Sequence, residues 1–263
     1  MRLDAFLVEK NIIKSRERAK EHIKNGDITV NGAVVLKPAA EISENDDVKF
    51  TGTALKYVGR GGLKLEKALK CFDIDLSGKV CLDIGASTGG FTDCMLQNGA
   101  SHVYAVDVGH GQLDITLIAD SRVTNMEKTN INDVFAESFD MMPEFISADV
   151  SFVSLKNVLP KISELMSDEG SAVVLIKPQF EAGKSNIGKN GIVKDRKVHI
   201  SVLNDIISYC NVVGLHVNKI DYSPISGGDG NIEYLAFITL NKNFVFVNNV
   251  KDIVNTAFSE VKK

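Results

Sequence analysis

The stretch KVCLDIGASTGGFTDCMLQNG, residues 79–99, decides the fold that we expect for this chain. Residues 79–85 predict a buried strand that runs into a glycine-rich turn, and residues 89–99 predict a short helix that ends at Gly99. The glycines allow the backbone to turn sharply and to approach a ligand closely. The stretch therefore predicts one strand–turn–helix unit of an α/β domain.

Strands and helices continue to alternate along the rest of the chain. We expect further strands at residues 102–109, 144–152, 171–177 and 233–240, and helices at residues 155–167 and 198–214. This alternation predicts an α/β fold with a Rossmann-like, doubly wound and largely parallel sheet over residues 59–263, after a connector at residues 51–59. Ligands of such sheets bind at the carboxyl ends of the strands.

The N-terminal residues 1–58 predict a separate, small α+β domain. Its second helix has Ser15 as its N-cap and Gly26 as its C-terminal stop. Two β-rich runs flank Asn31-Gly32, which is a strong signal for a hairpin. The expected order is two amphipathic helices, the hairpin and a short strand, at residues 2–13, 14–26, 27–38 and 41–50.

Basic residues gather in this N-terminal part, although the whole chain has a net charge of −4. The first 37 residues carry 8 Lys and Arg against 5 Asp and Glu. Arg16, Lys20 and Lys24 are spaced four apart, which puts them on one face of a helix. On its own, such a stripe is most simply a solvated helix face.

The composition argues against several classes of protein. No apolar run approaches the roughly 18 residues of a membrane span, and the charged start MRLDAFLVEK does not fit a signal peptide. The 4 cysteines form no CxxC pair, and the 5 histidines lack metal-ligand spacing. We therefore expect a cytoplasmic protein with no membrane span and no metal ion.

The glycine-rich turn indicates a cofactor site, and the acids near it indicate which cofactor. Dinucleotide sites have Gly-x-Gly-x-x-Gly, but Ser87 stands at the second glycine position. S-adenosylmethionine favours an acid before the first glycine, where Asp83 lies, and Asp107 could bind its ribose. The pattern favours S-adenosylmethionine over a nicotinamide, with a turn that binds nothing as the third alternative. The candidate cofactor-binding residues are Asp83, Gly85, Ala86, Ser87, Thr88, Gly89, Gly90, Phe91, Asp107 and Val108, together with Asn130 for the adenine, where Asn132 and Asp133 are alternatives.

Four charged residues are candidates for catalysis. Asp149 and Lys177 end predicted strands, Glu233 begins one, and Lys64 lies near the start of a helix before the sheet. Each of them alone could be a solvated surface charge. Together, a lysine beside a second lysine and two carboxylates can act as a base on a hydroxyl group. The chain also lacks the Asn/Asp-Pro-Pro-aromatic and Pro-Cys motifs that are typical of enzymes that methylate bases.

Three resemblances agree with these patterns. The N-terminal order of helices and hairpin resembles the S4-like domain, a small RNA-binding module. This resemblance implies that RNA phosphates are bound by the candidate RNA-binding residues Arg2, Arg16, Arg18, Lys20 and Lys24. The series Lys64, Asp149, Lys177, Glu233 is similar to the tetrad of the FtsJ-like ribose 2′-O-methyltransferases. Motifs along essentially the whole chain resemble the TlyA family, namely YVGRGGLKLEKAL, CLDIGASTGGFTDCMLQNGA, YAVDVGHGQL, DVSFVSL, LIKPQFEAGK and GNIEYLAF.

The resemblance to the TlyA family implies an S-adenosylmethionine-dependent enzyme that methylates the ribose 2′-oxygen of cytidine in ribosomal RNA, in 23S and for some members also in 16S RNA. By position, Lys177 would be the base, and Lys64, Asp149 and Glu233 would orient the ribose and tune the lysine. The expected partner is ribosomal RNA or a ribosomal subunit, and the oligomeric state is left open. Two alternatives remain: a membrane-active hemolysin, acting through residues 244–263, and a non-catalytic RNA-binding protein.

Overall fold

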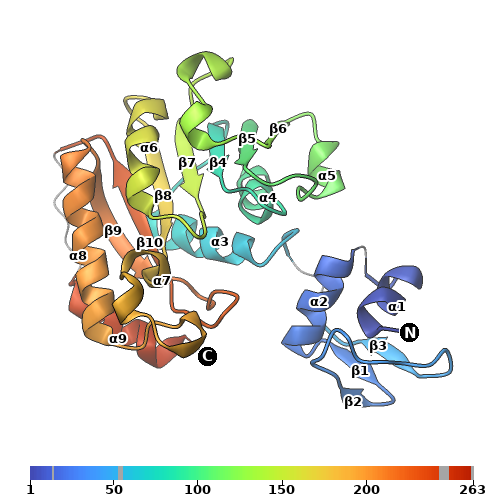
Figure 1. Cartoon of the computed structure of the whole chain (residues 1–263). Coiled ribbons are helices and arrows are strands. Elements are labelled where there is room, and N and C mark those ends of the chain that lie inside the picture. The colour runs from blue at the N-terminus through green and yellow to red at the C-terminus, as the bar shows by residue number, and fades with distance from the viewer. Residues whose placement is uncertain (14, 53–55, 243–248, 262–263) are drawn as a thin grey trace. The chain divides into compact units, whose positions relative to one another are not determined.

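The computed structural model describes residues 1–13, 15–52, 56–242 and 249–261. Two compact units make up the chain, Met1–Lys56 and Tyr57–Lys263 (Figure 1). The sequence prediction draws this boundary after residue 58, two residues later. Val58 belongs to the second unit, where its amide donates to the carboxylate of Asp93 at 2.8 Å. Each unit has its own hydrophobic core.

The first unit combines two helices with an antiparallel sheet of strand order β2-β1-β3. The predicted caps of its second helix are confirmed: the Ser15 hydroxyl accepts from the Arg18 amide at 3.3 Å, and Gly26 is left-handed with φ 82°. Asn31 and Gly32 have φ of 52° and 80°, the two positive angles that a type I′ hairpin turn requires. The elements are α1 (Leu3–Glu9), α2 (Arg16–Asn25), β1 (Ile28–Val30), β2 (Ala33–Val34) and β3 (Val48–Phe50).

A seven-stranded sheet of order β6-β5-β4-β7-β8-β10-β9 forms the centre of the second unit. The pairs from β6 to β8 are parallel, whereas β10 runs antiparallel to both β8 and β9. The largely parallel, doubly wound sheet predicted from the sequence is confirmed. Its strands are β4 (Val80–Ile84), β5 (His102–Asp107), β6 (Val123–Glu127), β7 (Phe145–Ala148), β8 (Ser171–Ile176), β9 (His216–Tyr222) and β10 (Tyr234–Thr239).

Helices cover both faces of this sheet (Figure 1). Ile162, Ile206 and Val254 of α6, α8 and α9 pack into the core on one face, and Leu65 and Met95 of α3 and α4 into the core on the other. The α-helices are α3 (Gly61–Phe72), α4 (Gly90–Gln97), α5 (Ile115–Ile118), α6 (Leu159–Leu165), α7 (Pro178–Glu181), α8 (Arg196–Val212) and α9 (Val250–Glu260), and the 3₁₀ turns are η1 (Ile131–Asp133), η2 (Ala136–Ser138), η3 (Leu155–Asn157), η4 (Lys184–Asn186) and η5 (Lys189–Gly191).

Helix α9 lies in the C-terminal segment for which the sequence leaves a membrane-active role open. Its residues Val250, Val254 and Ala257 are buried in the core of the second unit, so its apolar face is already covered. Residues 244–248 and 262–263 of that segment lie outside the described residues. Across the part of the chain that the structure describes, no helix is long and apolar enough to cross a membrane.

The turn after β4 brings three strand ends together. Gly85 has φ 81°, and a Cβ on it would lie 2.7 Å from the carbonyl oxygen of Asp149. The Gly85 amide donates to the carbonyl of Val106 at 2.9 Å, and the Asp149 amide donates to the carbonyl of Ile84 at 3.0 Å. A side chain at Gly85 is therefore opposed both by the backbone conformation and by the lack of space.

We predict that Gly85→Ala lowers the free energy of unfolding more than Gly78→Ala does. Gly78 also has a positive φ, 73°, but nothing lies within 4 Å of a Cβ built on it. Its substitution should cost about 1–2 kcal/mol for the left-handed conformation alone. Gly85→Ala must also displace the backbone of Asp149, which should bring the loss to about 2–4 kcal/mol. Urea unfolding measures both losses, and equal values would contradict the close approach.

Candidate active site

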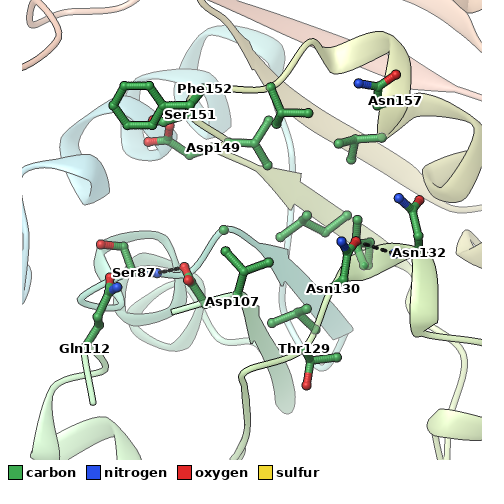
Figure 2. A pocket seen from close by; sticks show the side chains of 18 residues that line it. Ser87, Asp107, Gln112, Thr129, Asn130, Asn132, Asp149, Ser151, Phe152 and Asn157 are labelled. Carbon is green, nitrogen blue, oxygen red and sulfur yellow. Dashed lines mark hydrogen bonds between the residues drawn. The ribbon is translucent and has the colours of Figure 1, made fainter. Parts of the chain in front are cut away.

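A cavity of about 620 Å³ lies at the carboxyl ends of β4, β5 and β7 (Figure 2). The strand order reverses here, because β5 and β6 follow on one side of β4 and β7 and β8 on the other. Ligands of doubly wound sheets bind at such switch points, and the volume suits a small molecule. Of the predicted cofactor residues, those that line the cavity are Gly85, Ser87, Asp107, Val108 and Asn130.

Backbone amides fix Asp107 at this cavity. Its Oδ2 accepts from the Ser87 amide at 2.8 Å (Figure 2). Its Oδ1 accepts from the Gly109 amide at 2.7 Å. Each carboxylate oxygen can accept a second hydrogen bond, so Asp107 can also bind ribose hydroxyls. The side-chain oxygen of Asn130 accepts from the Asn132 amide at 3.0 Å, which orients its NH₂ group as a donor.

Sequence reasoning misses Glu127, the last residue of β6. Its carboxylate accepts from the amides of Gly111, Gln112 and Leu113 at 3.0, 2.7 and 3.2 Å. These hydrogen bonds lower the pKa of Glu127 to about 2. Since Gln112 lines the cavity, Glu127 holds part of the cavity wall in place. The sequence offers one signal for Glu127. It ends β6, which runs parallel to β5, the strand that Asp107 ends, so both carboxylates lie at one edge of the sheet.

Asp83 is absent from the cavity wall. Its side chain is fully buried and accepts hydrogen bonds from the hydroxyls of Thr92 at 2.7 Å and Ser147 at 2.9 Å. Burial raises the pKa of Asp83 to about 6. Asp83 thus ties α4 and β7 to β4, and this geometry does not support a direct contact with a cofactor. The other predicted residues that do not line the cavity are Ala86, Thr88, Gly89, Gly90 and Phe91.

The four predicted catalytic residues come from four elements and lie together. Lys64 belongs to α3, Asp149 follows β7, Lys177 follows β8 and Glu233 precedes β10. The Lys64 Nζ lies 2.7 Å from Oε2 of Glu233 and 3.6 Å from Oδ2 of Asp149. The Lys177 Nζ lies 2.5 Å from the other oxygen of Asp149, Oδ1. The result is a series of ion pairs, Glu233–Lys64–Asp149–Lys177, in which the sign of the charge alternates.

The side chains that form this series of ion pairs have little exposed surface. Lys64, Lys177 and Glu233 are 8%, 7% and 2% exposed. Burial alone lowers the pKa of Lys64, but the attraction of Asp149 and Glu233 outweighs it, so the pKa of Lys64 is raised. Lys64 therefore keeps its positive charge. The side chain of Asp149, between the two lysines, is 19% exposed. Buried charges are unfavourable unless they are paired, so the alternation of sign is what allows three of them beside Asp149.

Two glycines, Gly62 and Gly90, allow α3 to pack closely enough to place Lys64 beside Asp149 and Glu233. A Cβ on Gly62 would lie 2.4 Å from the ring of Tyr57, and a Cβ on Gly90 would lie 3.0 Å from the amide nitrogen of Gly62. The first turns of α3 and α4 therefore pack backbone against backbone. The glycines before Lys64 serve close packing of its helix.

Two further residues of the cavity wall, Ser151 and Phe152, are not singled out by the sequence. Lys177 Nζ donates to Oγ of Ser151 at 2.7 Å. Ser151 and Phe152 both line the cavity (Figure 2). Phe152 is 90% exposed, has a left-handed φ of 64°, and its ring lies 5.2 Å from that of Phe180. The signal that the sequence offers for both is their position two and three residues after Asp149.

Comparison with known proteins identifies the two units. The FtsJ-like methyltransferase family matches residues 57–240, and the S4 domain matches residues 1–48. The 16S/23S rRNA (cytidine-2′-O)-methyltransferase TlyA of Mycobacterium tuberculosis is 37% identical over 261 residues, 98% of this chain and 97% of its own. The chain belongs to the TlyA family of FtsJ-like methyltransferases.

Other TlyA-family relatives carry a different name. Hemolysin A of Brachyspira hyodysenteriae is 44% identical over 237 residues, which cover 90% of this chain and 98% of its own. A solved structure from Streptococcus thermophilus, named as a candidate hemolysin, has 42% sequence identity and a TM-score of 0.81 over 99% of this chain and 96% of its own. The fold is therefore shared by relatives under both names.

The S4 domain of this TlyA-family chain carries the five basic residues predicted to bind RNA. Two of them, Arg2 and Arg16, pair with the fully buried carboxylate of Asp4 at 2.8 and 3.2 Å. The hydrogen bond from Arg2 is the main reason that the pKa of Asp4 is far below its usual range. Both arginine side chains remain about half exposed, at 49% and 50%. They thus support the domain and still present donors to solvent. Lys24, on the same helix as Arg16, is exposed.

We predict that Glu127→Gln weakens the binding of S-adenosylmethionine. The amide side chain offers one neutral acceptor to three backbone amides, so the segment that carries Gln112 should loosen. The dissociation constant should rise about 5- to 30-fold, as expected for lost hydrogen bonds to a charged group. Calorimetric titration measures it, with Glu137→Gln, an exposed residue of η2, as the control. An unchanged dissociation constant would show that Glu127 does not shape the site.

Proposed function

We propose that this chain is an S-adenosylmethionine-dependent methyltransferase that acts on the ribose 2′-hydroxyl of cytidine in ribosomal RNA, with Lys177 as the base. One observation carries the proposal. Lys177 Nζ is held by Asp149 and Ser151, and these two residues also line the cavity at the switch point of the sheet. A base held at the wall of a cofactor cavity suits the transfer of a group to a hydroxyl.

The cavity suits S-adenosylmethionine by the chemistry of its walls. Asp107 would accept from the two ribose hydroxyls, and Asn130 would bind the adenine. At Gly85, where a side chain would collide with Asp149, the backbone can approach the ligand closely. Val108 and Val150 offer apolar surface to the rest of the molecule. When bound, this cofactor supplies an electrophilic methyl group on a positively charged sulfur.

In this proposal the two lysines have separate tasks. Lys177, once it has given up the proton of its ion pair with Asp149, takes the proton of the 2′-hydroxyl as a neutral amine while the ribose oxygen is methylated. Asp149, at 2.5 Å, then stabilises the ammonium that Lys177 becomes. Lys64 stays positive because its pKa is raised, and it holds the carboxylates of Glu233 and Asp149 in place. Lys64 and Glu233 therefore support the reaction mainly through the geometry of Asp149.

The S4 domain and the surface beside Lys177 favour a nucleic acid as the substrate. Arg16, Arg18, Lys20 and Lys24 would bind phosphates, which positions an RNA without reading its sequence. Phe152, exposed at the cavity, offers an aromatic face, and proteins stack unpaired RNA bases on such faces. Cytidine and ribosomal RNA follow from the names of the TlyA relatives. With that substrate we expect 23S RNA, and also 16S RNA, to be methylated in the cytoplasm.

Substitution of Lys177 tests this proposal. Lys177→Met removes the amine, and we expect transfer of labelled methyl from S-adenosylmethionine to ribosomal RNA to slow by about 10²–10⁴-fold, the usual contribution of a general base. Lys177→Arg should be as slow, because arginine keeps the charge but stays protonated. The arginine variant also keeps a positive charge beside Asp149, so a loss of activity in it does not come from unfolding caused by an unpaired carboxylate.

Lys161 provides the matched control for Lys177. It is equally buried, at 7% exposed, but pairs with Glu164 on α6. We expect Lys161→Met to keep the wild-type rate, and all three variants to keep wild-type affinity for S-adenosylmethionine. Wild-type rates in both Lys177 variants would rule out this lysine as the base.

A further inference from the structure

The amine of Lys177 has two fixed hydrogen-bond acceptors. One is Oδ1 of Asp149 at 2.5 Å, and the other is Oγ of Ser151 at 2.7 Å. In the proposed function Ser151 helps to hold Lys177 at the cavity wall, but it has no task in the reaction itself. Ser151 is exposed, so its hydroxyl could bond water instead. Burial therefore does not force its contact with the lysine.

The geometry of an amine gives this second acceptor a purpose. A lysine nitrogen has three directions besides its bond to Cε, and a neutral amine fills them with two N–H groups and one lone pair. Two acceptors that engage both N–H groups leave the lone pair in the third direction only. With Asp149 alone, the amine can rotate and point its lone pair to either of two directions. A base must point its lone pair at the proton that it takes. Free rotation therefore lowers the fraction of Lys177 amines that are in a reactive orientation.

The loop that carries Ser151 is anchored so that its distance to Lys177 is set. Glu181, on the helix α7 that follows Lys177, accepts from the hydroxyl of Ser154 at 2.6 Å and from the amide of Leu155 at 2.8 Å. At the other end of the loop, the Asp149 amide is bonded to the end of β4. Ser151 thus lies between two fixed points, and one of them belongs to the same segment as the lysine.

We propose that Ser151 is a positioning residue for the methyl transfer, which orients the lone pair of Lys177 by accepting one of its two N–H groups. This inference rests on the proposed function, in which Lys177 is the base. It requires only a hydroxyl at this place, which predicts that threonine can replace serine. Because Ser151 is exposed, the additional methyl group of a threonine has room.

The test compares Ser151→Ala and Ser151→Thr with the full-length wild type under steady-state conditions, with ribosomal RNA and S-adenosylmethionine as substrates. Ser151→Ala should lower kcat about 5- to 50-fold, in proportion to one lost hydrogen bond at a reacting group. The KM for RNA and the dissociation constant of S-adenosylmethionine should stay within about twofold, because the residue acts on the lysine. Ser151→Thr should restore kcat to within about threefold of wild type.

Ser259→Ala is the matched control, because the Ser259 hydroxyl bonds carbonyls of its own helix α9, at Asn255 and Thr256. A wild-type kcat in Ser151→Ala would overturn the inference. So would a loss that appears in cofactor affinity instead of kcat, or a loss that threonine does not repair. If the wild type transfers no methyl group to RNA, the proposed function falls first and this inference falls with it. If the wild type is active and Ser151→Ala equals it, only this inference falls.

Discussion

Four charged side chains in a place nearly closed to water must neutralise one another, and the methyltransferase domain is arranged so that they do. Glu233, Lys64, Asp149 and Lys177 alternate in sign, and the inner two each contact opposite charges on both sides. Loss of one partner would leave a buried charge without compensation, at a cost of about 3–5 kcal/mol. The proposed role of Lys177 as the base therefore depends on the whole series of ion pairs.

The direction of the strands brings these charges to one edge. Strands β7 and β8 are parallel, so Asp149 and Lys177, which follow them, lie at the same edge of the sheet. Strand β10 runs antiparallel to β8, and its first residue, Tyr234, pairs with Ile176, the last residue of β8. Glu233, which precedes β10, therefore lies at that edge as well. A purely parallel sheet would carry Glu233 to the opposite edge. The antiparallel direction of β10 is therefore what brings Glu233 to the other three charges.

The sequence is informative where function depends on the ends of strands. The glycine turn, Asp107, Asp149, Lys177 and Glu233 stand at strand ends that the alternation of strands and helices predicts. The resemblance to the FtsJ-like tetrad groups Lys64 with the last three, and the structure brings these four charges together. Asp83 shows the limit of this reasoning. Its side chain points to Thr92 and Ser147 instead of the cavity, and only the packing of α4 on the sheet determines that direction.

Residues that act through other residues are harder to predict. Glu127 and Ser151 serve backbone amides and a lysine nitrogen that lie far from them in sequence, so their roles depend on which loops meet. Strand β9 is missed for a local reason. Its buried Asn218 and exposed Lys219 interrupt the alternation of apolar and polar residues that marks a strand.

The identity of the methylated atom tests the central claim most directly. The purified chain would be incubated with isotopically labelled S-adenosylmethionine and ribosomal subunits, and the RNA would be digested to nucleosides and analysed by mass spectrometry. A lysine base beside the cofactor cavity predicts label on a ribose, and the TlyA relatives point to cytidine, so we expect 2′-O-methylcytidine. Label on a base atom, or no labelled nucleoside from either subunit, would contradict it.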